Sequence, residues 1–309
     1  MRLDGIHHIT AITADAARNV DFYARVLGLR LVKKTVNFDA PDFYHLYFGD
    51  ELGNPGSAMT FFEFPGAAPG NAGDGMIHRV IWRVASEDAL DFWSGRLEDE
   101  GASPRREGSS LLFADPEGLE LELTAEPAGD EPLAAAAAGV PPEHALLGFH
   151  GARAYAADVE ANRWILVDTL GFDAHTGGDG YLLSGDTRKA AYHVDPAPGS
   201  APSQGAGTVH HIAFTAADDE HAAWRDHIRS TGVHATDIID REYFRSIYFR
   251  EPSQVLFELA TPSPGFTVDE PAARLGEGLM LPPQYEPLRS RIEQSLTPVA
   301  NPRSALAGG

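Results

Sequence analysis

The stretch Gly5-Ile6-His7-His8-Ile9-Thr10 decides the fold, because its His-His-Ile centre returns late in the chain as His210-His211-Ile212. Both copies lie in short apolar segments of the kind that form β-strands. A carboxylate, Glu258, lies in the apolar run Val255-Leu256-Phe257-Glu258-Leu259. A buried carboxylate is costly without a cationic partner or a metal. Two His and one Glu on strands therefore predict a metal site.

Only one His of each pair is expected to bind the metal, since adjacent side chains of a strand point to opposite faces. A single His on a half-buried strand is more often a hydrogen-bonded core residue than a ligand. The repetition of the motif favours the ligand interpretation. Comparison of the repeats then indicates which His of each pair is the ligand.

The chain aligns with itself as four copies of one unit. The corresponding positions are His8, Arg79, Gly151 and His211. Each lies in a strand-like segment that precedes a helical stretch, and each helical stretch carries one aromatic residue that we expect in the core: Tyr23, Trp93, Trp164 and Trp224. Three more strands follow, over 29–36, 43–48 and 58–64 in the first copy and over 236–240, 246–249 and 255–260 in the fourth. The sequence thus predicts an α+β fold of four βαβββ modules.

Composition changes divide the four modules into two pairs. Residues 1–126 hold the first two modules, and residues 146–262 hold the other two. The segment 127–145, rich in Ala and Pro, is the expected linker. Residues 263–309 form a tail with a predicted helix over 285–296.

The composition excludes several kinds of site. With no Cys, the chain has no disulfide, zinc–thiolate site or iron–sulfur cluster, so a metal must be held by His and carboxylates. A net charge of -21 argues against binding to nucleic acid or to an anionic membrane surface. No apolar run approaches membrane-spanning length. The first strand follows Met1 so closely that we expect no signal peptide. We expect a cytoplasmic protein with an apolar core.

The repeat positions separate candidate ligands from other residues. Of the four corresponding positions, only those of the first and fourth modules are His, so His8 and His211 are the candidate ligands. Glu122 matches Glu258 but has no His partner, so we assign it a structural or surface role. Glu63 is taken as the counterpart of Glu258 in the first module. If Glu63 points inward, the centre has four ligands and suits isomerase or hydrolytic chemistry; if it points away, the centre has three ligands and open positions.

These features carry a family resemblance. Four βαβββ modules with His-His-Ile motifs resemble the vicinal oxygen chelate superfamily, which includes glyoxalases and extradiol dioxygenases. The segments GIHHIT at 5–10, LYFGD at 46–50, GNPG at 53–56 and REYFRSIYFREP at 241–252 resemble ring-cleaving dioxygenases that act on hydroquinones. The resemblance covers nearly the whole chain and implies paired vicinal oxygen chelate domains.

The resemblance also implies a site and a reaction. It implies an Fe(II) centre, with Mn, Zn or Ni as other divalent metals, and a small aromatic substrate that reacts with O2. The implied metal ligands are His8, His211 and Glu258. The implied residues near the substrate are His7, His210, Arg241 and Tyr248.

The chemistry of ring opening explains these residue types. Dioxygen reacts slowly with an aromatic ring unless one metal binds both, which requires open coordination positions. We expect His210 and Tyr248 to serve as base and proton donor, and Arg241 to orient an anionic substrate or to hold Glu258. His7 is expected to support a ligand or to be structural.

The leading hypothesis is an extradiol-type dioxygenase that opens a hydroquinone or a related dihydroxy aromatic ring. A glyoxalase-like isomerase or lyase with Glu63 as a fourth ligand is the alternative. A metal-free protein that sequesters a small aromatic compound is the third. A homo-oligomer is compatible with all three.

Overall fold

The four predicted modules are present in the computed structural model, which describes residues 1–126, 129–174 and 180–305. The first two residues of the predicted linker and the last four of the tail lie outside the described residues. The first module contains β1 (Leu3–Thr13), α1 (Ala16–Val20), the π-helical turn η1 (Asp21–Val26), β2 (Arg30–Asn37), β3 (Ala40–Gly49) and β4 (Ala58–Glu63). The second contains β5 (Met76–Arg83), α2 (Glu87–Asp99), β6 (Arg105–Glu107), β7 (Ser110–Ala114) and β8 (Glu120–Thr124).

The second half of the chain repeats this order after a short helical turn, η2 (Pro142–His144). The third module contains β9 (Phe149–Ala156), η3 (Ile165–Thr169), β10 (Asp173–Ala174), β11 (Gly180–Ser184) and β12 (Lys189–Pro196). The fourth contains β13 (Val209–Ala216), α3 (His221–Ser230), β14 (Ile239–Asp240), β15 (Arg245–Arg250) and β16 (Leu256–Ala260). The α+β class and the βαβββ order are confirmed.

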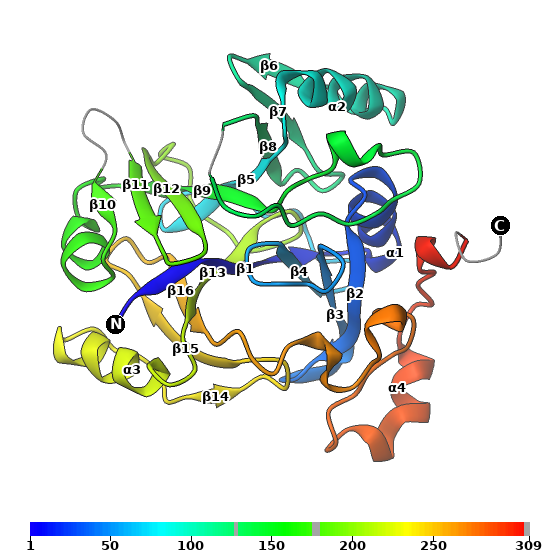
Figure 1. The fold of residues 1–309 in the computed structure, drawn as a ribbon. Helices are drawn as coiled ribbons and strands as arrows, with labels where there is room; N and C mark the ends of the chain where they lie inside the picture. The colour runs from blue at the N-terminus through cyan, green and yellow to red at the C-terminus, as the bar shows by residue number, and fades with distance from the viewer. Residues whose placement is uncertain (127–128, 175–179, 306–309) are drawn as a thin grey trace.

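The strands form two eight-stranded sheets, each built from one module of each half of the chain. The first sheet has the order β14-β15-β16-β13-β1-β4-β3-β2 and joins the fourth module to the first. The second has the order β10-β11-β12-β9-β5-β8-β7-β6 and joins the third to the second. Antiparallel pairs, β1 with β13 and β5 with β9, connect the modules at the centre of each sheet (Figure 1). The two halves of the sequence therefore interleave in space.

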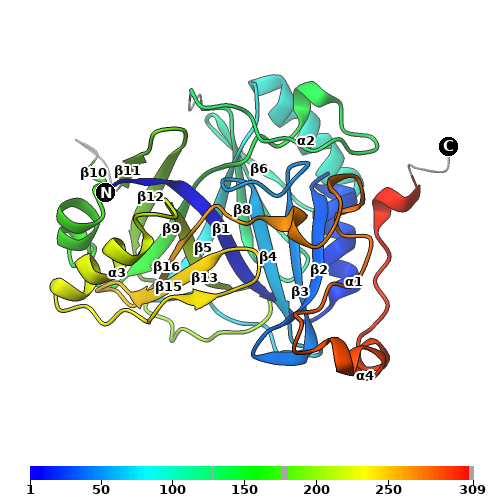
Figure 2. The ribbon, with the colours of Figure 1, turned by 60° about the horizontal axis from the view of Figure 1, so that its bottom comes forward.

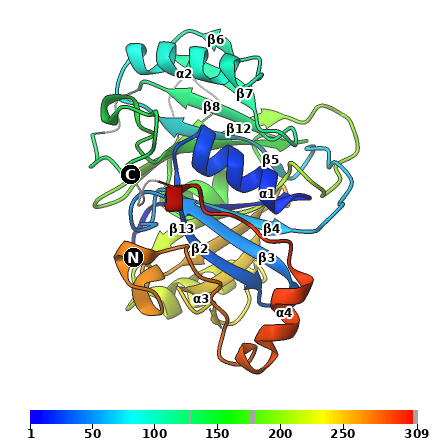
Figure 3. The same ribbon diagram turned by 90° about the vertical axis from the view of Figure 1, so that its right-hand side faces the viewer.

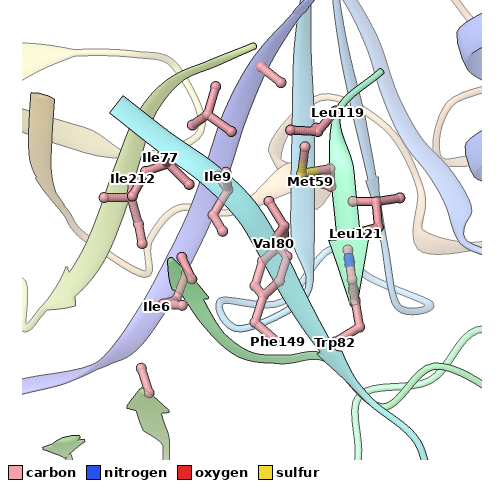
Figure 4. Close-up of a cluster of buried hydrophobic side chains, with 14 of the residues drawn as sticks. Ile6, Ile9, Met59, Ile77, Val80, Trp82, Leu119, Leu121, Phe149 and Ile212 are labelled. Carbon is pink, nitrogen blue, oxygen red and sulfur yellow. The ribbon is translucent and has the colours of Figure 1, made fainter. Parts of the chain in front are cut away.

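The core lies between the two sheets. Ile9 of β1, Met59 of β4 and Ile212 of β13 belong to one buried cluster with Val80 and Trp82 of β5 (Figure 4). All five side chains are at most 2% exposed. The opposite face of the first sheet is left free to form a cavity.

The helices pack where their sequence pattern predicts, with one exception. In α2 the hydroxyl of Ser86 accepts a hydrogen bond from the backbone of Ala89 and caps the helix, and Trp93 is fully buried. The prediction that all four helical aromatics are buried was wrong for Trp164, which is 40% exposed. Trp164 precedes the π-helical turn η3, where Ile165 and Leu166 take the core positions.

The first strand of each module contains a β-bulge at the residue before the repeat position. The register between β1 and β13 shifts at His7 and at His210, and the register between β5 and β9 shifts at His78 and at His150. A bulge adds a residue and turns the neighbouring side chains. The expectation that paired His residues point to opposite faces was therefore wrong, because the two rings of each pair are in contact.

The tail lies along the first sheet, close to β2 and β3 (Figure 3). It contains short turns, η4 (Phe266–Val268), η5 (Ala272–Arg274), η6 (Glu286–Leu288) and η7 (Pro302–Ala305), and the predicted helix as α4 (Arg289–Ser295). The buried ammonium of Lys33 on β2 binds the carboxylates of Asp269 and Glu270. Among the described residues no helix is long and apolar enough to cross a membrane.

Candidate metal centre

Three predicted ligands meet on the free face of the first sheet. His8 of β1, His211 of β13 and Glu258 of β16 come from three neighbouring strands (Figure 2) and are at most 4% exposed. His8 Nε2 lies 3.2 Å from His211 Nε2 and 3.2 Å from Glu258 Oε2. His211 Nε2 lies 2.9 Å from the same carboxylate oxygen. Within the described part of the chain, this trio is the one group of His and acidic residues whose donor atoms converge closely enough to hold a metal ion.

The spacing of these atoms suits a metal. Ligand atoms about 2.1 Å from a metal are separated by about 3.0 Å when they lie at right angles, and by about 3.4 Å at tetrahedral angles. The observed distances of 2.9 to 3.2 Å match one face of an octahedron. Two His and one carboxylate on such a face leave the other positions open.

Glu258 is oriented for this role by one hydrogen bond. Ser246 of β15 donates to Oε1 at 2.5 Å, while the buried Oε2 faces the Nε2 atoms of His8 and His211. Burial alone would raise the pKa of this carboxyl, but His8 and His211 lower it well below its usual value. The acid is thus held ionised, with one oxygen left for a cation.

The first His of each pair supports the second. His7 Nδ1 lies 2.9 Å from His8 Nδ1, and His210 Nδ1 lies 2.8 Å from His211 Nδ1. His7 Nε2 contacts the carbonyl of Thr261 at 3.1 Å. Burial, and then the neighbouring ligand, lower the pKa of both His7 and His210 to about 3, so both rings are neutral.

A cavity of about 400 Å³ opens beside the trio. Its walls include two predicted ligands and three predicted substrate-side residues: His8, His211, His210, Arg241 and Tyr248. His7 does not line it and lies behind His8. Arg241 lines the cavity, where its guanidinium lies 5.5 Å from the ring centre of Tyr248 and 3.3 Å from Asp39 Oδ2.

Glu63 is not the counterpart of Glu258, which corrects the alignment made from sequence. In the fourth module Glu258 pairs with Ala213, two residues after the ligand His211. In the first module the residue two positions after His8 is Thr10, and Thr10 pairs with Thr60. Glu63 lies farther along β4 and accepts a hydrogen bond from the backbone of Ala16. The first module therefore has the hydroxyl of Thr60, and no carboxylate, at the position that corresponds to Glu258.

The second sheet shows the same construction with different residues. Glu122 occupies the place of Glu258 and accepts a hydrogen bond from Ser110, as Glu258 does from Ser246. Arg79 stands at the position of the ligand His and pairs with Glu122 at 3.3 Å. A guanidinium thus balances this carboxylate, which agrees with the structural role expected for Glu122.

Most other residues of the cavity wall have no role predicted from the sequence, and two of them interact with each other. His45 and Tyr47 of β3 line it and are hydrogen-bonded to each other. Their spacing of two along a strand was the available signal, because it places both on one face. Phe244, which contacts the rings of His7 and His8, lies in the segment 241–252 that carries the family resemblance.

The family model described as "Glyoxalase/Bleomycin resistance protein/Dioxygenase superfamily" matches residues 5–123 and 147–259. The Bacillus subtilis protein named "Putative ring-cleaving dioxygenase MhqO" is 44% identical over 95% of this chain and 96% of its own length. The "Chlorohydroquinone/hydroquinone 1,2-dioxygenase" of Sphingobium indicum is 34% identical, and the alignment covers 96% of each chain.

Solved structures agree with this grouping. The crystal structure of a "putative dioxygenase from Bacillus subtilis" superposes with a TM-score of 0.89 at 40% identity, covering 97% of this chain and 98% of that one. A glyoxalase I of Zea mays superposes with a TM-score of 0.60 at 15% identity, covering 84% of this chain and 94% of that one, and so shares the fold alone. The chain belongs to the glyoxalase/bleomycin resistance protein/dioxygenase superfamily and, within it, to the family of ring-cleaving dioxygenases.

Proposed function

We propose that the protein is an Fe(II)-dependent extradiol-type dioxygenase that opens the ring of a hydroquinone or a related dihydroxy aromatic compound. One observation carries the proposal: two His and one Glu meet beside a cavity, and the residue of the first module that corresponds to Glu258 is Thr60 rather than a carboxylate. Such a trio leaves room for substrate and dioxygen together. Relatives named as ring-cleaving dioxygenases support it.

In this proposal His8, His211 and Glu258 hold the metal. When bound, the metal lowers the pKa of a substrate hydroxyl and brings ring and dioxygen together. His7 fixes His8 by accepting the hydrogen of His8 Nδ1 and donating its own Nε2 hydrogen to Thr261, which leaves His8 Nε2 as a lone pair. His7 is therefore a positioning residue.

His210 and Tyr248 handle protons at the cavity wall. If His211 binds metal through Nε2, its Nδ1 hydrogen is donated to His210 Nδ1, and His210 then offers its Nε2 hydrogen to the cavity. Burial, and then Glu258, raise the pKa of Tyr248, so its phenol stays protonated and can donate. This arrangement makes His210 a hydrogen donor rather than the base expected from sequence.

Arg241 supplies the positive charge on the substrate side. Its guanidinium stays ionised at all working pH values and suits a phenolate or a ring substituent with negative charge. It stacks on Tyr248, whose hydroxyl shares the cavity. We propose that Arg241 orients the ionised substrate rather than Glu258, whose oxygens face Ser246 and the two His ligands.

The glyoxalase-like alternative loses the residue on which it depended, because Glu63 binds the backbone of Ala16. The sequestration alternative gives no reason for two imidazole nitrogens and a carboxylate oxygen to converge within 3.2 Å of one another on a buried face. Oxygen uptake tests the proposal. Protein loaded with Fe(II) under anaerobic conditions should consume oxygen with hydroquinone and produce a ring-cleavage absorbance band, and Glu258→Gln should do neither. No uptake across a panel of hydroquinones and catechols, by protein with a full metal content, would exclude a ring-cleaving activity.

A further inference from the structure

Four buried side chains that the metal centre does not use form a continuous chain of hydrogen bonds across the first sheet. Thr10 Oγ1 and Thr60 Oγ1 lie 2.7 Å apart, and Thr60 Oγ1 lies 3.0 Å from His45 Nε2. His45 Nδ1 lies 2.9 Å from the hydroxyl of Tyr47. The four residues belong to neighbouring strands, β1, β4 and β3, and none is more than 8% exposed.

This hydrogen-bonded chain of four side chains has one donor hydrogen more than it has hydrogen bonds. Burial, and then the nearby His8 and His211, lower the pKa of His45 well below its usual value, so its ring is neutral and carries a single N–H. The three hydroxyls and this N–H supply four hydrogens to three hydrogen bonds. The spare hydrogen must therefore be at one end of the chain, on Thr10 or on Tyr47.

Both ends face the cavity, at different places. Thr10 lines it and is paired with His211 in the neighbouring strand, so this end lies on the metal side. Tyr47 lines it from β3, two strands away from β1. No other hydrogen-bond partner of Thr10 Oγ1 or of the Tyr47 hydroxyl is present among the described residues. At any moment one end offers a hydrogen and the other offers only lone pairs.

We propose that the chain Thr10–Thr60–His45–Tyr47 is the specificity determinant for a para-diphenol with one ionised hydroxyl. The inference rests on the proposed function. The un-ionised hydroxyl of the substrate donates to Tyr47, which sets the direction of all three bonds. The spare hydrogen then appears on Thr10, where it meets the ionised oxygen on the metal side. The hydroxyl hydrogens turn on their own oxygens, while His45 loses its hydrogen from Nδ1 and gains one at Nε2 by exchange with solvent. Each of the four groups ends with one hydrogen, so no net charge moves.

The same count disfavours a ligand that only accepts hydrogen bonds at its far end. Such a ligand needs a hydrogen from Tyr47, while its ionised oxygen needs one from Thr10. The chain has only one to give, so one buried acceptor stays unpaired, and an unpaired acceptor weakens binding by about tenfold or more. 4-Methoxyphenol is such a ligand, since it keeps one ionisable hydroxyl and replaces the other with a methoxy oxygen.

The test compares anaerobic binding of hydroquinone and 4-methoxyphenol to the metal-loaded protein. Wild type should bind hydroquinone about tenfold more tightly or better. Thr60→Val removes the middle of the chain without changing the cavity wall, so Tyr47 and Thr10 can donate independently and the ratio should fall to within about twofold of one. Thr35→Val is the control, because the Thr35 hydroxyl on β2 is buried and outside the chain, and it should keep the wild-type ratio.

The outcomes separate the possible errors. A ratio unchanged in Thr60→Val, with normal metal content, overturns the proposal and indicates that the extra methyl group is rejected sterically. If Thr60→Val fails to fold, His45→Phe breaks the same chain and must abolish the preference. If wild-type protein consumes oxygen with hydroquinone but does not prefer it to 4-methoxyphenol, the role of the hydrogen-bonded chain is contradicted and the proposed function is not. Wild-type protein that binds and oxidises neither compound contradicts the proposed function as well.

Discussion

Replacing Glu258 by Gln should abolish the stabilisation of the protein by divalent metal. The amide keeps the shape of the side chain but removes the charge that the buried Oε2 presents to His8 and His211. The matched control is Glu122→Gln. Glu122 has the same place in the second sheet and the same serine hydrogen bond, but its cation is Arg79.

The size of the effect follows from binding linkage. A metal at one hundred times its dissociation constant stabilises the folded protein by about 2.7 kcal/mol. One kcal/mol shifts the melting temperature by about 2–4 °C in a domain of 150–250 residues, and by less in a larger one. For this chain of 309 residues we expect a shift of about 4 °C in wild type and in Glu122→Gln. Glu258→Gln should shift by less than about 1 °C.

Thermal unfolding with and without metal, under anaerobic conditions for Fe(II) and in air for Mn(II) or Zn(II), measures this difference. A chelator added afterwards should return wild type to its original melting temperature. The reasoning is refuted if Glu258→Gln keeps the full shift. It is also refuted if Glu122→Gln loses it while remaining folded, because the carboxylate of the second sheet would then bind the metal.

Three further predictions concern single side chains. Ser246→Ala frees Glu258 Oε1 and should weaken metal binding about 10–100-fold in a chelator competition, whereas Ser110→Ala should not. Lys33→Met leaves two carboxylates without their cation and should lower the free energy of unfolding, measured by urea denaturation, by about 3–5 kcal/mol. A decrease below about 1 kcal/mol contradicts this. Burial raises the pKa of Glu251 from 4.5 to about 7, so its contribution is greatest at acid pH and is lost as the pH rises through 7. Between pH 5 and 8 wild type should lose about 2 kcal/mol more than Glu251→Gln, and parallel curves would disprove the buried acid.

The repeat made much of the fold predictable. Apolar strands and the buried aromatic residue of three of the four helical stretches follow from the hydrophobic pattern. Gly28 and Gly101, which follow the helical stretches of the first two modules, have the positive φ that glycine favours at such ends. The ligand positions followed as well, since His8 and His211 stand out against Arg79 and Gly151. The structure brings them together with Glu258, and their role as ligands stays a prediction.

Register and bulges were beyond the sequence. Strand β4 is apolar on both faces, so its pattern allowed Glu63 to be aligned with Glu258, and only the pairing with β1 selects Thr60. The bulge at His7 left no compositional sign, because it depends on how β1 meets a strand from the other half of the chain. His45 lies outside both His-His-Ile motifs, and one of its two hydrogen-bond partners, Thr60, comes from the neighbouring strand β4.

The interleaving of the two halves has a consequence for how the protein is assembled. His8 is synthesised early and Glu258 late, so the first sheet is complete only when the fourth module is available to pair with the first. Neither half expressed alone contains all three residues of the centre, whereas the two halves expressed together could rebuild it by pairing β1 with β13. Metal uptake would then report the completion of the chain, and a truncated product would carry neither the centre nor its reactivity toward oxygen.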